Sequence, residues 1–184
     1  MEFNSGITTY GEFRKTWVWE DCQDYDTLAW KERLKERLAI LLEETFVESS
    51  VSQAIIQQRY LEDFTSNSST IESTLLALKK HLDFKFPEPA KVISYLIKHR
   101  NIFDVVLLGC VLTQEKFGHS AEISLELYSD PEIDDEYLTI YVRQNPYEPN
   151  IIKKIDAICE EYMNVLDIDQ GYLLVTTDFQ RPRE

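Results

Sequence analysis

Two stretches of alternating residues, separated by a short acidic turn, constrain the fold of this chain more than any other feature. In both stretches an apolar side chain falls at every second position, which is typical of a strand with one buried face. The apolar row consists of Ile123, Leu125, Leu127, Leu138, Ile140 and Val142. Pro131 and a dense group of carboxylates lie between the stretches and suit a turn better than a strand interior. Residues 121–143 therefore predict a β-hairpin.

A hairpin with one apolar face needs a covering layer, because an isolated pair of strands is marginally stable in water. Residues 101–117 can supply that layer, since they are apolar on nearly all sides, as buried helices are. We expect Asn101 to cap this helix, Gly118 to end it in a left-handed conformation, and the helix to lie on the apolar face of the hairpin. Alternation returns at residues 172–179 and predicts a third strand, which follows a helix between about 145 and 166.

Helical spacing of apolar residues runs through the first half of the chain, and we expect helices at residues 26–46, 50–60, 69–82 and 89–99. Ser50 and Ser69 each open a capping-box pattern. Pro87 and Pro89 mark the best candidate boundary, because each proline disfavours helix at the preceding residue. The predicted class is α+β: a mainly helical half, then a small antiparallel or mixed sheet packed against a buried helix. Residues 1–86 form the helical region and residues 87–184 the α+β domain, as two units or as one continuous domain.

Acidic residues are concentrated at the C-terminal end of the chain. The net charge is −14, and residues 119–184 hold 15 acidic and 5 basic residues, a balance of −10. Such a surface repels phosphate backbones and attracts basic proteins. We therefore expect a protein partner, for which a basic surface is the best match, and no nucleic acid. Nucleic-acid binding through the helical region is the weakest hypothesis, because residues 1–86 carry a balance of −5 themselves.

Cysteine usage and hydropathy favour a cytoplasmic protein. Cys22, Cys110 and Cys159 lie far apart, with neither a C-x-x-C motif nor the even number that a disulfide framework needs. The longest apolar run, residues 105–112, is far shorter than a membrane span. The N-terminus lacks the basic-then-apolar order of a signal peptide. No membrane association is expected.

Motifs for nucleotide binding and for nucleophilic catalysis are absent from the sequence, so we expect no catalytic residue and no cofactor. His81, His99 and His119 each lack a second histidine or cysteine at the spacing of metal ligands. Cys110, inside the apolar helix, should be an inert buried thiol. Cys159 stands beside two glutamates, whose negative charge should raise its pKa and suppress its reactivity.

The turn of the predicted hairpin holds the densest polar cluster of the chain. Its carboxylates are Asp130, Glu132, Asp134, Asp135 and Glu136. Carboxylate oxygens are ligands for Mg²⁺ and Ca²⁺, so the cluster is a speculative cation site. The alternative function that follows is a metal-dependent hydrolase or nucleotide-acting enzyme, with Arg143 as an anion contact. The glycine of an EF-hand loop is missing, and a solvated turn that guards the sheet edge is the simpler interpretation.

The second face of the hairpin carries tyrosine and arginine, which are enriched at protein interfaces. This candidate interaction face consists of Tyr128, Tyr137, Thr139, Tyr141 and Arg143. It is either an exposed docking surface or an inner surface covered by a helix from residues 24–82. The leading hypothesis is a non-enzymatic, acidic interaction or regulatory protein that uses this face to bind another protein and that forms homo-oligomers.

Overall fold

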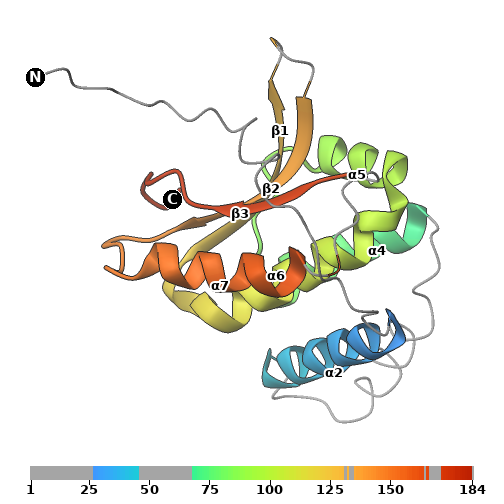
Figure 1. The fold of residues 1–184 in the computed structure, drawn as a ribbon, viewed down its shortest axis with the longest axis horizontal. Helices are drawn as coiled ribbons and strands as arrows, with labels where there is room; N and C mark the ends of the chain where they lie inside the picture. Colours follow the sequence, from blue (N-terminus) through green and yellow to red (C-terminus); the bar gives the residue numbers. More distant parts are fainter. Residues whose placement is uncertain are drawn as a thin grey trace, which may run out of the picture.

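The computed structural model describes residues 27–45, 68–130, 132, 135–163, 165 and 171–183. The predicted helix at 50–60, Cys22 and Asp134 lie outside these ranges. The described chain has the predicted α+β class (Figure 1). In chain order the helices and strands are α2 (Thr27–Thr45), α4 (Ser68–His81), α5 (Pro89–Lys98), α6 (Phe103–Phe117), β1 (Glu122–Asp130), β2 (Asp135–Arg143), α7 (Ile151–Met163) and β3 (Leu173–Thr176).

The three strands form a mixed sheet in the order β1-β2-β3. β1 and β2 are antiparallel, as the hairpin prediction requires, and β3 runs parallel to β2. The hairpin register places Ile123 opposite Val142, Leu125 opposite Ile140 and Leu127 opposite Leu138. Five of these six side chains are buried and Leu127 is half-buried, so the predicted apolar face is confirmed.

α6 is the covering layer of this face, as the apolar sequence predicts. Residues 105–114 are buried without interruption. Gly109 lets the helix approach the sheet closely, because a Cβ at this position would lie 2.8 Å from Cδ2 of Leu173 and 3.3 Å from Cδ1 of Ile140. α2 lies against the side of α6 that faces away from the sheet (Figure 1), where Lys31 forms an ion pair with Asp104 at 2.6 Å.

The start of α6 differs from the prediction. Asn101 does not cap the helix: it lies in a 3-10 turn, Arg100–Ile102, and the N-cap is Ile102, which forms no side-chain cap hydrogen bond. Ile102 is buried, so packing of this side chain outweighs the local capping preference. At the other end, Gly118 has the expected positive φ of 50°, although its ψ of −137° lies outside the left-handed helical region.

A short extended segment before α5 adds to the sheet edge. The backbone N–H of Lys85 donates to the carbonyl of Ile123 at 2.9 Å, and the N–H of Leu125 donates to the carbonyl of Lys85 at 3.0 Å. This isolated bridge is parallel to β1. No strand was predicted here, although Leu82, Phe84 and Phe86 alternate with Asp83 and Lys85, because the alternation ends at Pro87 after only five residues. Phe84, the preceding residue, is fully buried.

α7 closes the opposite edge of the sheet with two side chains. Leu138 N–H donates to Tyr172 O, so the carbonyls of Leu173 and Val175 point away from β2. The hydroxyl of Tyr162 donates to Leu173 O at 3.1 Å, and the thiol of Cys159 donates to Val175 O at 3.7 Å. The outer carbonyls of β3 thus have partners without a fourth strand.

The buried apolar residues of the described ranges form one cluster, which extends from Leu34 in α2 to Val175 in β3. None of the described helices combines the length and the apolarity needed to cross a lipid bilayer.

Candidate functional site

The hairpin extends beyond the helices as a projecting tip (Figure 1). β1 and β2 stay paired up to Asp130 and Asp135, which lie opposite each other at the turn. The carboxylate of Asp130 accepts the backbone N–H of Glu132 at 2.9 Å and so stabilises the turn. The described carboxylates of this tip belong to Asp130, Glu132, Asp135 and Glu136.

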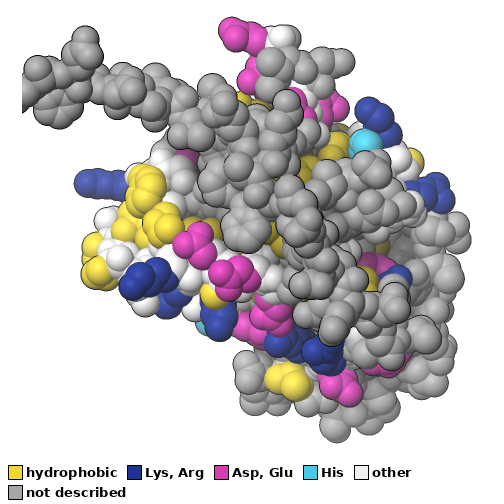
Figure 2. Space-filling view, in the orientation of Figure 1, with side chains coloured by type: hydrophobic (Ala, Val, Ile, Leu, Met, Phe, Trp, Pro, Cys, Tyr) yellow, Lys and Arg dark blue, Asp and Glu magenta, His cyan; other side chains and the backbone are white. Residues whose placement is uncertain are grey.

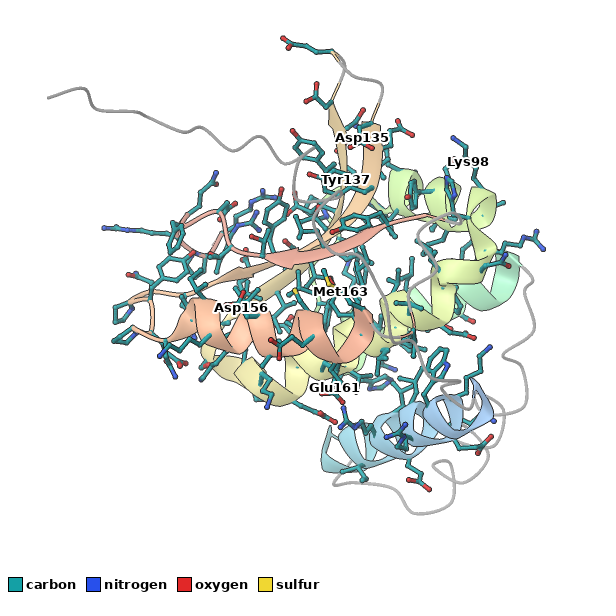
Figure 3. All side chains as sticks on the ribbon, viewed as in Figure 1. Lys98, Asp135, Tyr137, Asp156, Glu161 and Met163 are labelled. Carbon is teal, nitrogen blue, oxygen red and sulfur yellow. The ribbon has the colours of Figure 1, made fainter. Side chains whose placement is uncertain are left out.

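Three tyrosine rings lie next to the acidic turn. Tyr128 and Tyr137 are cross-strand partners, and their rings stack with centroids 4.8 Å apart and an angle of 28° between planes. The edge of Tyr172 meets Tyr137 at 5.8 Å and 89°. Figure 3 labels Asp135 and Tyr137, which lie on the same strand near the tip. Tyr128 is 39% exposed, so the outer ring of the stack is accessible.

The other end of the same sheet face is a buried ion cluster around Arg143. This side chain is only 1% exposed. Its Nε and Nη2 donate to Oδ2 of Asp178 at 2.9 and 2.7 Å, while Nη1 donates to Oγ of Ser124 at 2.8 Å and to Oε1 of Glu126 at 3.2 Å. The guanidinium also lies 4.8 Å from the centre of the Tyr141 ring. Arg143 is therefore committed to internal contacts.

Burial and charge shift the pKa values of this cluster in opposite directions. Burial by itself would lower the pKa of Arg143, but the hydrogen bonds and negative charges of Asp178 and Glu126 outweigh burial and raise it. Burial would raise the pKa of Asp178, but its contacts with Arg143 hold it below the usual value. The pKa of the Tyr141 hydroxyl is raised, chiefly by burial and then by the two neighbouring carboxylates. Each group is thereby held in one protonation state near neutral pH.

The chain after β3 crosses this end of the face. Tyr147 Oη donates to the carbonyl of Gln180 at 2.6 Å, and the backbone N–H of Arg183 donates to Oε2 of Glu122 at 2.9 Å. Together with the Arg143–Asp178 pair, these contacts fix residues 177–183 over the end of β2. The C-terminal segment, rather than α2 or α4, therefore covers this end of the face.

The candidate interaction face thus divides into two parts. Thr139 and Arg143 are each 1% exposed and offer no surface to a partner. Tyr141 is half-buried beside Arg143. Tyr128 and Tyr137 are the part that lies at the projecting tip, next to the carboxylates.

The described carboxylates of the tip do not form a metal site with other side chains. Within the described residues, no group of three or more His, Cys, Asp or Glu side chains is arranged to hold a metal ion. Asp134, the remaining member of the speculative cation site, lies outside these residues. No contact in the described ranges adds support to the hydrolase hypothesis.

The two described cysteines are free thiols, and Cys110 is buried as the sequence predicts. Burial raises the pKa of Cys110, which has no exposed surface. The pKa of Cys159 is also raised, but burial is the largest cause, and the charges of Asp156 and Glu160 add to it. The sequence by itself indicated only the neighbouring charge as a cause. For His81, burial lowers the pKa, with a further contribution from Lys80.

Sequence reasoning missed Ser124, Glu126 and Asp178 as partners of Arg143. One signal was available, because an in-register hairpin places Glu122 opposite Arg143 and so puts opposite charges side by side. Asp178 had no comparable signal, since its contact requires that β3 pair with β2.

Neither a protein-family model nor any curated protein or solved structure matches this chain.

Proposed function

We propose that this chain is a non-enzymatic interaction or regulatory protein that binds a basic partner protein through the projecting end of its hairpin. We call this end the tyrosine tip and define it by Tyr128, Tyr137, Tyr172, Asp130, Glu132, Asp135 and Glu136. The observation that carries the proposal is the Tyr128–Tyr137 stack, one face of which is accessible directly beside the acidic turn.

The chemistry of the tyrosine tip matches a cationic ligand. The face of a tyrosine ring attracts lysine and arginine side chains through its quadrupole, typically by about 0.5–1 kcal/mol at exposed sites. Nearby carboxylates add a longer-range attraction that increases the association rate and is weakened by salt. Stacking fixes the rings in advance, so little side-chain freedom is lost when a partner binds.

Self-association is a separate part of the proposal and would use another surface. Hydrophobic side chains gather over the β2–α7 loop, at the end of the molecule that carries the C-terminal segment (Figure 2). Phe179 is 63% exposed and Ile152 is 48% exposed. The ring of Phe179 lies 5.3 Å from that of Tyr147. Exposed apolar side chains of this kind favour contact between copies.

The free thiols of Cys110 and Cys159 would fit a reducing compartment, and we propose that the binding takes place in the cytoplasm.

A lysine-rich synthetic peptide labelled with a fluorophore tests the binding proposal by anisotropy at two salt concentrations. We expect saturable binding that weakens as salt increases. Substituting Asp130→Asn with Glu132→Gln should weaken binding by about tenfold, because two charges of the tip are lost. The matched control, Glu72→Gln with Asp156→Asn, changes the net charge equally at exposed positions outside the tip. Equal losses in both variants, or no binding at low salt, would overturn the proposal.

Light scattering coupled to size-exclusion chromatography tests self-association. A dimer or larger species is expected, and Phe179→Ser should shift it toward the monomer. A monomer at all accessible concentrations contradicts self-association and leaves the binding of a basic partner as a separate question.

A further inference from the structure

The outer edge of β1 has a defined pattern of free backbone groups. Because Lys85 bonds to Ile123 and Leu125, the N–H and C=O groups of the odd-numbered residues of β1 point away from β2. The even-numbered residues form the ladder with β2. Within the described residues of β1 from Leu125 onward, the outward groups without a backbone partner are the carbonyl of Leu125 and the N–H and C=O groups of Leu127 and Ser129.

Pro87 explains why the Lys85 segment does not pair with β1 beyond Leu125. The next residue of the Lys85 segment that would face β1 is residue 87, and proline has no N–H to donate to the carbonyl of Leu125. Among the described residues, none forms a backbone hydrogen bond on the outer side of Leu127 or Ser129. Ser129 is exposed and Leu127 is half-buried. An open strand edge of this kind is a template for pairing with another chain.

Given the binding of a basic partner proposed for the tyrosine tip, we infer that the partner binds as an added β-strand. An extended segment of the partner pairs with β1 from Leu127 to Ser129 and continues the edge on which Lys85 already forms a bridge. Main-chain hydrogen bonds supply affinity in this mode, and alternate side chains supply specificity.

The side chains of β1 define the sequence that such a strand needs. Glu126, Tyr128 and Asp130 lie on one face of the edge, and Leu127 lies on the other. Basic residues of the added strand would lie beside Tyr128 and Asp130, because Glu126 on the same face already pairs with Arg143 and Arg183. Apolar residues would lie beside Leu127. The partner segment therefore alternates basic and apolar residues.

A second copy of this chain is a poor occupant of the same edge. Pairing β1 with β1 across a two-fold axis would bring Glu126 and Asp130 of one copy beside those of the other. Like charges on neighbouring strands are destabilising, and proteins use them to prevent edge-to-edge association. Charge complementarity therefore selects a basic segment over a second copy.

A short peptide of alternating lysine and valine provides the probe. One version carries N-methyl groups on its lysines and another carries them on its valines, so each version lacks the amide donors of one edge of the peptide. We expect one methylated version to bind at least about fivefold more weakly than the other, because it cannot donate to β1. If the peptide methylated on valine is the weaker binder, the added strand is antiparallel to β1. If the peptide methylated on lysine is the weaker binder, the added strand is parallel to β1.

The outcomes separate the two proposals. If neither the lysine-rich peptide nor the unmodified lysine–valine peptide binds, the proposed function itself fails, and if only the lysine-rich peptide binds, strand addition is overturned. If the unmodified lysine–valine peptide binds and the two methylated versions bind equally, the strand-addition mode is overturned while binding to the tip stands.

A variant of the protein gives an independent readout. Ser129→Pro removes an outward N–H that the β1–β2 ladder does not use, and an edge strand tolerates proline at such a position. Binding should fall by about fivefold relative to Ser129→Ala. Should the proline variant fail to fold, hydrogen exchange on the unaltered protein replaces it: the amide of Leu127 should become protected when the peptide binds. Unchanged exchange at Leu127 in a saturated complex contradicts strand addition.

Discussion

Arg143 and Asp178 lie 35 positions apart in the sequence and meet in a bidentate contact, with Nη2 of the arginine 2.7 Å from Oδ2 of the aspartate. Arg143 ends β2, and Asp178 follows β3, so the parallel pairing of these strands brings the two side chains together. Because Glu122 and Glu126 also surround the guanidinium, one buried cation balances several carboxylates.

Replacing Arg143 should destabilise the protein strongly. Arg143→Met leaves Asp178 and Glu122 without this cation, while Glu126 keeps a contact with Arg183 at 3.6 Å. Breaking a buried pair in this way typically costs about 3–5 kcal/mol. The free energy of unfolding in urea measures the effect. Lys154→Met is the control, because Lys154 pairs with Glu148 in a partly exposed contact that is worth about 1 kcal/mol or less. Similar losses in both variants would show that the buried cluster does not stabilise the fold.

The Arg143–Asp178 pair also predicts an acid-sensitive fold. The folded-state pKa of Asp178 is lowered, so its contribution to stability is fully present above the unfolded pKa near 3.8 and is lost as pH falls through the lower, folded value. Urea unfolding from neutral pH to about pH 3 should show decreasing stability below about pH 4. Asp178→Asn removes this titration and should flatten that part of the curve. An unchanged slope in Asp178→Asn would exclude this carboxylate as a source of the acid sensitivity.

Tyr162 provides a test of how α7 closes the sheet edge. Tyr162→Phe removes the hydroxyl that donates to Leu173 O and should lower the free energy of unfolding by about 1–2 kcal/mol at neutral pH. Burial raises the pKa of Tyr162 above the usual value of 10, so its stabilisation is present below that pH and is lost as pH rises further. The difference between the wild type and Tyr162→Phe should therefore shrink in strong alkali.

Tyr147→Phe is the matched control for Tyr162, because its hydroxyl bonds the exposed residue Gln180. We expect its loss to cost less than that of Tyr162. If Tyr147→Phe lowers the free energy of unfolding more than Tyr162→Phe does, the tyrosine hydroxyl at the C-terminal segment contributes more to stability than the one at the β3 edge.

Gly109 should be sensitive to the addition of one methyl group. Alanine favours helix over glycine by about 1 kcal/mol, but its Cβ would overlap Leu173 and Ile140 on the buried side of α6. Overpacking of a core typically costs about 1–3 kcal/mol, so Gly109→Ala should be destabilising overall. Thermal unfolding measures the change. A higher melting temperature would show that the helix-to-sheet contact is loose.

Calorimetric titration with Mg²⁺, Mn²⁺ and Ca²⁺ tests the alternative of a metal-dependent enzyme. We expect no saturable heat at millimolar metal, because the described carboxylates of the tip are not grouped with a third ligand. A saturable heat that Asp130→Asn removes would revive the hydrolase hypothesis.

Local periodicity was sufficient to predict the hairpin, the helix beneath it and the third strand. Alternation of Ile123, Leu125 and their partners fixes which side of each strand is apolar, and the continuous apolar run of α6 requires burial on all sides. The start of α6 was predicted wrongly, because capping preferences are worth about 1 kcal/mol and the burial of Ile102 can exceed that.

The candidate site was only partly readable from the sequence. Tyr128, Tyr137 and the carboxylates of the tip were named, whereas Tyr172 was not. Arg143 was expected to form part of the interaction face, but it is buried. Its burial depends on residues 177–183, which cross the face only after β3 has paired with β2. Likewise, the carbonyl acceptors of Tyr162 and Cys159 belong to a strand that follows them in the chain.

The sequence by itself determined the helices and strands and the side of each strand that is buried, because hydrophobic periodicity is a property of a single segment. Within the part of the chain that the structure describes, tertiary contacts decided which residues of the second face stay accessible and which edge of the sheet has no further partner. Both outcomes depend on contacts between segments far apart in the chain. The Arg143–Asp178 ion pair holds the C-terminal segment over one end of the face, and Pro87 ends the pairing of the Lys85 segment with β1.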